Sequence, residues 1–142
     1  MKRVKRGGFS LIELMVVIVI LGLLAAIVVP NLVGKSDDAK VKLTTVQMKQ
    51  LEEALNMFRL DNGRYPTTEE GLEILIEKPE DLDLPNYARG GYLGGKSIPK
   101  DPWANEYLYF KDGSGFEIIS LGADGEEGGE EIDADIKYSD SK

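Results

Sequence analysis

Residues 5–30 read KRGGFSLIELMVVIVILGLLAAIVVP, and this stretch decides the fold of the chain. Residues 14–29 are sixteen positions without a polar side chain, and counting back to Phe9 extends the apolar run to 21 residues. Only Ser10 and Glu13 interrupt the run, which is long enough to span a bilayer as a helix. Because four bases and no acid precede it, we expect the N-terminus to lie on the cytoplasmic side of a membrane.

An ordinary secretory signal peptide is the first alternative for this stretch. Such a peptide has an apolar region of about 7–15 residues, followed by a cleavage site with small residues. Here the apolar run is longer, and the sequence LLAAIVVPN at its end offers no such site. We therefore expect the apolar segment to remain on the mature protein.

Composition excludes several classes of function. The 142 residues include no cysteine and no histidine, which excludes disulfides, thiolate nucleophiles, imidazole bases and the usual zinc sites. Residues 9–142 carry 13 bases and 25 acids, so nothing in the folded part favours binding to nucleic acid. No glycine-rich phosphate loop precedes a helix. We expect that the protein is not an enzyme.

The apolar run continues as one stripe of a longer helix. Apolar residues recur at a spacing of three, four or seven positions, at Val41, Met48, Leu51, Ala54, Leu55 and Phe58. This predicts a helix over residues 9–60, kinked near Pro30, whose first half is apolar on all sides and whose second half packs against a small domain. The turn residues 61–63 (DNG) are expected to end it.

The remainder predicts a small sheet and one more helix. Residues 67–70 match a capping box, which predicts a short second helix that ends before Pro79. Residues 79–105 are predicted as an ordered loop. Strands over residues 106–111 and 116–121 flank the turn sequence DGSG and predict a hairpin, with a third strand near Tyr92 and Trp103 anchored in the core. The fold class is therefore α+β.

The C-terminal segment, residues 120–136, contains seven acids and no base. One interpretation is a solvated, disordered tail. The other is a metal-binding loop, because glycines at positions 122, 125, 128 and 129 permit tight turns and Ile132 and Ile136 offer apolar anchors. If the glycines fold the loop back, Asp124, Asp133 and Asp135 converge, and such oxygen ligands suit Ca²⁺. The order of residues is not that of an EF-hand.

Glu13 has two interpretations. In the first, it is an acid near the end of a simple membrane anchor, where the cost of a charge is small. In the second, it needs a cationic partner.

The residues Gly8-Phe9-Ser10-Leu11-Ile12-Glu13 resemble the class III signal of type IV pilins. That resemblance implies that a prepilin peptidase cleaves between Gly8 and Phe9 and that Phe9 is N-methylated. The freed amine of Phe9 would then pair with Glu13 of a neighbouring subunit in a filament.

Three further stretches carry a second resemblance. LDNGRYPTTEEGLEILIEKP, DPWANEY and SLGADGEEGGEEIDADI are similar to the major pseudopilins of type II secretion systems (the general secretion pathway protein G family), within the type IV pilin-like superfamily. The resemblance implies a pilin-like fold, in which a long N-terminal helix with a transmembrane first half packs on a small antiparallel sheet. It also implies a structural calcium ion in the C-terminal loop, with Asp124, Asp133, Asp135 and the carbonyl of Leu121 as ligands.

The family implies an organisation and a function. Residues 1–8 are expected to be a cleaved leader, 9–30 the transmembrane and assembly helix, and 31–142 a periplasmic globular domain. The implied function is a subunit that polymerises with itself into a periplasmic pseudopilus and drives export of folded proteins through an outer-membrane secretin. Implied partners are the prepilin peptidase, minor pseudopilins, the inner-membrane platform of the secretion system and the inner membrane. Two alternatives stay open: a surface type IV pilin and a membrane-anchored calcium-binding domain that does not polymerise.

Overall fold

The structure is a computed structural model that describes the backbone of residues 7–142 and the side chains of residues 7–27 and 36–142. The chain divides into two compact units, with the boundary between Asp38 and Ala39. The described residues of the first unit are a short non-helical segment, residues 7–10, and the first part of a long helix, and the second unit combines the rest of that helix with a small sheet and long ordered loops.

Helix α1 extends over Leu11–Asn62 and contributes to both units. The sequence predicts one helix over residues 9–60, and the structure confirms it with both ends two residues further along the chain. The helix ends at Gly63, which has a φ of 76° and donates its N–H to the carbonyl of Arg59 at 2.7 Å. Glycine adopts this conformation readily at helix C-termini. The predicted kink near Pro30 falls outside the described side chains.

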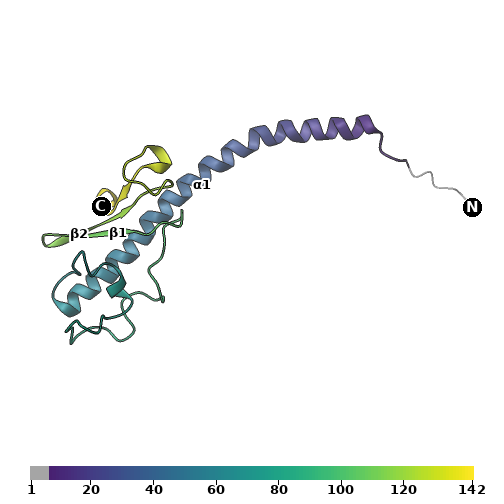
Figure 1. Cartoon of the computed structure of the whole chain (residues 1–142). Helices are drawn as coiled ribbons and strands as arrows, with labels where there is room; N and C mark the ends of the chain where they lie inside the picture. The colour runs from purple at the N-terminus through teal and green to yellow at the C-terminus, as the bar shows by residue number, and fades with distance from the viewer. Residues whose placement is uncertain (1–6) are drawn as a thin grey trace, which may run out of the picture. The chain divides into compact units, whose positions relative to one another are not determined.

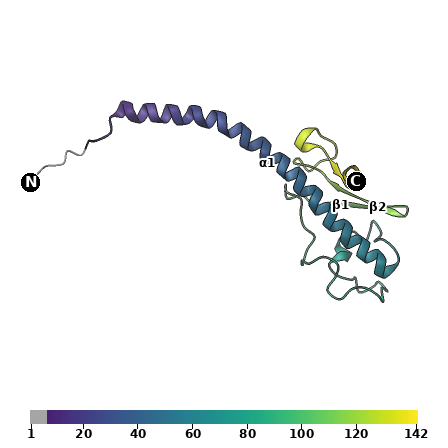
Figure 2. The ribbon, with the colours of Figure 1, turned by 180° about the vertical axis from the view of Figure 1, so that it is seen from behind.

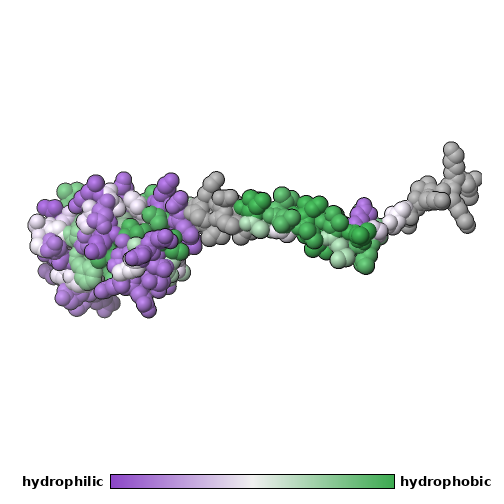
Figure 3. All heavy atoms as spheres, turned by 90° about the horizontal axis from the view of Figure 1, so that it is seen from above, coloured by the Kyte–Doolittle hydropathy of each residue, from purple (hydrophilic) through white to green (hydrophobic). Residues whose placement is uncertain are grey.

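From Leu11 to Ile27, the side chains of α1 are apolar on nearly all sides, with Glu13 as the charged exception. Every residue from position 11 to position 27 is exposed, and Figure 3 shows a continuous hydrophobic surface along this part of the helix. Among the residues whose side chains are described, no helix contains a stretch both long and apolar enough to cross a membrane. The span predicted for residues 9–30 includes three residues outside that set and stays a prediction.

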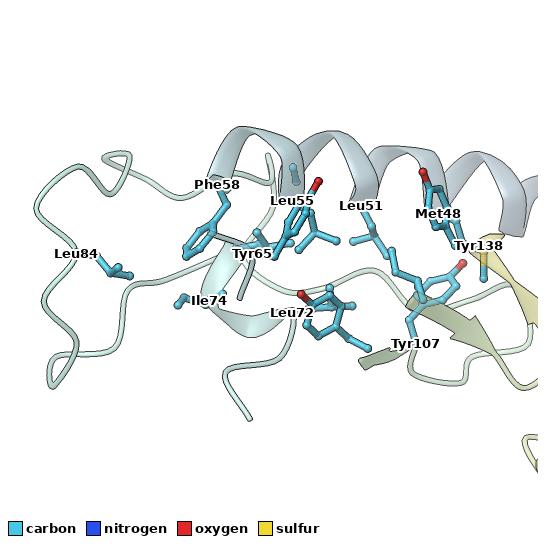
Figure 4. Close-up of a cluster of buried hydrophobic side chains, with 14 residues drawn as sticks. Met48, Leu51, Leu55, Phe58, Tyr65, Leu72, Ile74, Leu84, Tyr107 and Tyr138 are labelled. Carbon is cyan, nitrogen blue, oxygen red and sulfur yellow. The ribbon is translucent and has the colours of Figure 1, made fainter. Parts of the chain in front are cut away.

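The core of the second unit is built on one face of α1. Side chains at helical spacing on this face are almost completely buried, namely those of Met48, Leu51, Ala54, Leu55 and Phe58. Figure 4 shows Met48, Leu51, Leu55 and Phe58 projecting toward buried side chains from the rest of the unit, including Tyr65, Leu72, Ile74, Leu84, Tyr107 and Tyr138. The amphipathic stripe predicted for the second half of the helix is therefore confirmed.

A three-stranded antiparallel sheet of order β1-β2-β3 belongs to the second unit. Strands β1 (Leu108–Asp112) and β2 (Gly115–Ser120) form the predicted hairpin, and β3 (Ile136–Lys137) pairs with the end of β2. Figures 1 and 2 show the hairpin lying beside the second half of α1. The α+β class is confirmed.

The third strand predicted near Tyr92 is wrong. Gly90 and Gly91, with φ of 88° and 78°, turn the chain out of the extended conformation immediately before it. The N–H of Tyr92 then donates to the carbonyl of Leu75 at 2.7 Å rather than to a neighbouring strand. The sheet takes its third strand from the C-terminal segment instead.

The predicted second helix is mostly replaced by turns. Its capping box does form, because the N–H of Glu70 donates to Thr67 Oγ1 at 3.2 Å and the N–H of Thr67 donates to the Glu70 carboxylate at 2.7 Å. Gly71 follows with a φ of 62°, which a right-handed helix does not allow. Only the short 3-10 helix η1 (Glu73–Leu75) forms, and no helix or strand follows it before β1, as expected for residues 79–105.

Candidate functional sites

The N-terminal candidate site begins with a short segment of accessible backbone. Residues 7–10 are not helical, and apart from the adjacent residues no described atom lies within 4 Å of the position that a Cβ at Gly8 would occupy. The side chain of Phe9 is 83% exposed. The bond between Gly8 and Phe9, predicted as the processing site, therefore lies in the kind of exposed segment that proteases prefer.

Glu13 lies in the first turn of α1, which Ser10 caps. The N–H of Glu13 donates to Ser10 Oγ at 3.2 Å, and the N–H of Leu14 donates to the Ser10 carbonyl at 3.2 Å. A carboxylate in the first turn interacts favourably with the positive end of the helix dipole. The Glu13 side chain is exposed and has no ion-pair partner among the described residues, so it is accessible to a cation on another molecule.

The C-terminal candidate site is the loop between β2 and β3, residues 121–135. It bends at glycines with positive φ, namely Gly122, Gly125, Gly128 and Gly129. The N–H of Ala123 donates to the Ile132 carbonyl at 2.9 Å, and the N–H of Asp135 donates to the Gly128 carbonyl at 3.2 Å. These hydrogen bonds close the loop on itself, which favours the interpretation of a folded loop over that of a solvated tail.

The three aspartates predicted as calcium ligands lie in this loop in different environments. Asp124 is exposed, and its Oδ1 accepts the N–H of Glu126 at 3.1 Å. Asp133 and Asp135 are half-buried. In the described part of the chain, no three carboxylates lie close enough together to hold a metal ion by themselves. A cation in the loop would therefore need backbone carbonyls, such as that of Leu121, among its ligands.

One atom of Asp135 bears directly on cation binding. Its Oδ2 accepts the N–H of Gly128 at 3.1 Å, but its Oδ1 is buried and has no hydrogen-bond partner among the described residues. A buried carboxylate oxygen without a donor or a cation is unfavourable. Carboxylate and carbonyl oxygens are the ligands that Ca²⁺ prefers. The residues present therefore fit a hard cation of this kind.

Comparison with known proteins identifies the family. The family model described as type II secretion system, protein G, matches residues 31–139. The type II secretion system core protein G of Vibrio cholerae serotype O1 is 49% identical over 134 residues, which cover 93% of this chain and 90% of that protein. The chain belongs to the type II secretion system protein G family. The core protein G of Pseudomonas aeruginosa is also 49% identical, over 139 residues and 96% of each chain.

A solved pseudopilin has the same fold as this protein G family member. The crystal structure of the major pseudopilin from the type 2 secretion system of enterohaemorrhagic Escherichia coli matches with a TM-score of 0.64. Its sequence is 42% identical, and the match covers 78% of this chain and 95% of that chain. The pilin-like fold predicted from the sequence is therefore confirmed.

The N-terminus of this protein G family member matches a second model. This model, described as a prokaryotic N-terminal methylation motif, covers residues 3–29 and thus includes Gly8, Phe9 and Glu13. The match agrees with the predicted resemblance to the class III signal. The individual roles of Gly8, Phe9 and Glu13 stay predictions.

The residues that hold the acidic loop to the rest of the domain were not predicted from the sequence. Asp101 and Asn105 lie in the turn before β1, and both hydrogen-bond to residues 120–122. The signal was the Asp-Pro pair in the stretch DPWANEY, which is typical of a turn stabilised by its own side chain. The prediction that Trp103 anchors the core is wrong, because Trp103 is only half-buried, with the Lys40 ammonium 5.9 Å from its ring centroid.

Proposed function

We propose that this protein is the major subunit of the periplasmic pseudopilus of a type II secretion system. In this role it polymerises with itself and drives export of folded proteins through the outer-membrane secretin. Membership of the protein G family and the methylation motif support the proposal. The relatives are named as a core protein of a secretion system and as a pseudopilin, which favours a structural role over a catalytic one.

The observation that carries the proposal is the exposed apolar surface of α1. Between positions 11 and 24, the large apolar side chains are 44% to 78% exposed. Apolar surface of this extent is unfavourable in water. It therefore has to be covered by lipid before assembly and by helices of other copies in a filament. We infer an inner-membrane location with the second unit in the periplasm, followed by transfer into a periplasmic filament.

We also propose that the N-terminus is processed before assembly. A prepilin peptidase cuts the accessible bond between Gly8 and Phe9, and the new amine of Phe9 is methylated. Glu13 has no cation beside it in the described chain, so the cationic amine of a neighbouring copy supplies the missing charge. Water is scarce around these charges in the filament, so an unpaired charge there would be costly, and pairing therefore selects for correctly assembled copies. Further expected contacts are the minor pseudopilins and the inner-membrane platform.

The test of processing is the mass of the N-terminal peptide after expression with the matching prepilin peptidase. We expect a peptide that begins with N-methylated Phe9. In Gly8→Val the β-branched side chain at the cleaved bond should stop cleavage, whereas the control Gly7→Ala should be processed normally. A peptide that retains Met1 in the unmodified protein would contradict the proposal and would favour a plain membrane anchor.

We further propose that the C-terminal loop binds Ca²⁺. Asp124, Asp133, Asp135 and the carbonyl of Leu121 would hold it, and the unpartnered Oδ1 of Asp135 supports this choice. The ion would supply positive charge among the carboxylates and link the two ends of the loop. No disulfide is available for this purpose in a chain without cysteine.

The calcium proposal is tested by thermal unfolding of the full chain in detergent, with calcium and with a chelator. An ion that binds only the folded state stabilises it by about 2.7 kcal/mol at a hundredfold excess over its dissociation constant. We expect this stabilisation to disappear in Asp135→Asn and to persist in the control Glu127→Gln, whose side chain is exposed in the same loop. An unfolding temperature of the unmodified protein that does not respond to the chelator contradicts calcium binding.

A further inference from the structure

The turn formed by residues 101–105 is built around a buried carboxylate. Asp101 is only 4% exposed, and its Oδ1 accepts the N–H groups of Trp103 at 3.0 Å and of Asn105 at 2.8 Å. The N–H of Asp101 in turn donates to the carbonyl of Asn105 at 2.9 Å. These three hydrogen bonds fix both ends of the turn relative to each other, so the side chain of Asn105 leaves the turn from a rigid backbone.

Two hydrogen bonds connect this turn to the start of the acidic loop. Asp101 Oδ2 accepts the hydroxyl of the completely buried Ser120 at 2.7 Å. Asn105 Nδ2 donates to the carbonyl of Gly122 at 2.9 Å. The turn therefore holds the residue before Leu121 and the residue after it.

Asn105 makes one more contact with the loop. A Cβ placed on Gly125, which has a φ of 70°, would lie 3.1 Å from Asn105 Oδ1. The amide of Asn105 thus packs closely against the loop backbone at Gly125 while it donates to Gly122. Its position constrains the chain on both sides of Asp124.

The orientation of the Leu121 carbonyl follows from these contacts. The N–H of Gly122 belongs to the same peptide group as that carbonyl, and it donates to Ser120 Oγ at 3.5 Å. Because the peptide group is planar and trans, the C=O points away from the side on which the N–H lies. The hydroxyl that is held by Asp101 therefore sets the direction of the Leu121 carbonyl, and Asn105 holds the next peptide along.

We propose that Asn105 and Ser120 are positioning residues of the calcium loop. Ser120 holds the peptide group between Leu121 and Gly122, and Asn105 holds the peptide group that follows it, so that this part of the loop is ordered before the ion binds and little order is lost on binding. This inference rests on the proposed calcium site. Partners that orient metal ligands in this way typically change the affinity for the metal by about 10–100-fold when they are removed.

A merely structural role for these hydrogen bonds makes a different prediction. If Asn105 only joined the turn to the loop, its removal would lower the unfolding temperature equally with and without calcium. A positioning residue must lower the affinity for calcium itself. The control is Asn56→Ala, because Asn56 lies on α1 and its Oδ1 accepts the hydroxyl of Tyr65 at 2.7 Å, a side-chain hydrogen bond between residues outside the loop.

The experiment is calorimetric titration of the full chain in detergent with CaCl₂, for the unmodified protein, Asn105→Ala, Ser120→Ala and Asn56→Ala. We expect the dissociation constant to rise about tenfold or more in the first two variants and to stay unchanged in Asn56→Ala. Unfolding in chelator, measured on the same samples, shows whether each variant is folded. Two independent variants keep the test decisive if one of them does not fold.

Two outcomes overturn the inference, and they are distinguishable. Unchanged calcium affinity in both Asn105→Ala and Ser120→Ala, with normal binding by the unmodified protein, overturns the positioning role alone. No binding of calcium by the unmodified protein overturns the calcium site, and the positioning role with it.

Discussion

Replacing Glu70 with glutamine tests how much one ion pair contributes to the stability of the second unit. Arg64 Nη1 and Nη2 donate to the two carboxylate oxygens of Glu70 at 2.6 Å and 2.7 Å. The N–H of Thr67 donates to the same carboxylate at 2.7 Å. Glutamine keeps one acceptor oxygen for these donors but brings an NH₂ group against the guanidinium. Glu70→Gln therefore removes one charge-assisted hydrogen bond and the attraction between the charges.

The magnitude follows from the exposure of the pair. The Glu70 side chain is 12% exposed, and that of Arg64 is 37% exposed. Fully exposed pairs contribute about 0–1 kcal/mol, and breaking a buried pair costs about 3–5 kcal/mol. Because this pair is partly buried, breaking it should cost an amount between these two values, and we expect Glu70→Gln to lower the free energy of unfolding by about 1.5 kcal/mol. For a chain of this size, that lowers the unfolding temperature by about 5 °C.

The pH dependence separates the ion pair from other effects. Hydrogen bonds from the Arg64 guanidinium lower the pKa of Glu70 in the folded protein, with burial opposing them. A lowered pKa means that this stabilisation is present above the pKa of the unfolded chain, about 4.3, and is lost as pH falls through the folded pKa. The difference between the unmodified protein and Glu70→Gln should therefore be largest at pH 7 and should shrink in acid.

The assay is urea unfolding of the full chain in detergent at pH 7 and at pH 3. The control is Glu69→Gln, which removes the same charge from the neighbouring exposed residue and should change stability by less than about 0.5 kcal/mol. If Glu70→Gln loses the same stability at both pH values, the charge of Glu70 is not the source of the effect. The reasoning from geometry to stability is then refuted.

Two further substitutions test the core and the acidic loop by the same unfolding measurement. Leu55→Ala removes a completely buried side chain from α1 and should lower the free energy of unfolding by about 3 kcal/mol. The control Met57→Ala, on the exposed face of the helix, should lower it by less than about 1 kcal/mol. Equal losses would contradict the packing shown in Figure 4. Gly122→Ala places a Cβ 2.7 Å from the carbonyl oxygen of Asp133 at a φ of 68° and should destabilise the loop by well over 1 kcal/mol. Gly113 also has a positive φ, but a Cβ placed on it meets no atom within 4 Å. An equal loss of stability in Gly113→Ala and Gly122→Ala would show that the backbone conformation alone, and not the contact with Asp133, is responsible.

Elements specified by local patterns could be predicted from the sequence. The stripe from Met48 to Phe58 repeats at the helical period, so it identifies both the helix and the face that is buried. The turn at Gly113 likewise identifies the hairpin, because strand residues flank it directly. The glycines of the acidic loop were recognised as positions for positive φ, and all four adopt it.

Features that depend on contacts between distant segments could not be predicted. The third strand forms because Ile136 reaches Ser120, and no local pattern distinguishes a strand of two residues. Asn105 contacts Gly122, 17 positions away, and one sequence without an alignment does not indicate that pairing. Ile132 was expected to anchor the loop but is 38% exposed, because an apolar residue alone does not specify which surface it meets.

The candidate calcium ligands were likewise predictable from the sequence only in part. Residue type and glycine spacing indicated a loop with oxygen ligands, and the structure adds the unpartnered Oδ1 of Asp135. The sequence did not indicate how the carboxylates lie relative to one another, because that depends on the backbone of the whole loop. In the described chain they do not form a cluster of three, so a bound cation would need backbone carbonyls as well as carboxylates.

The central claim is that the N-terminal helix assembles copies of this chain into a filament through Glu13. The most direct measurement is the amount of filament seen by electron microscopy when the unmodified protein, Glu13→Ala and the control Ser36→Ala are produced with the same secretion apparatus. We expect Glu13→Ala to be inserted and cleaved normally but to form few filaments, while the unmodified protein and the control assemble. Normal filaments from Glu13→Ala would contradict it.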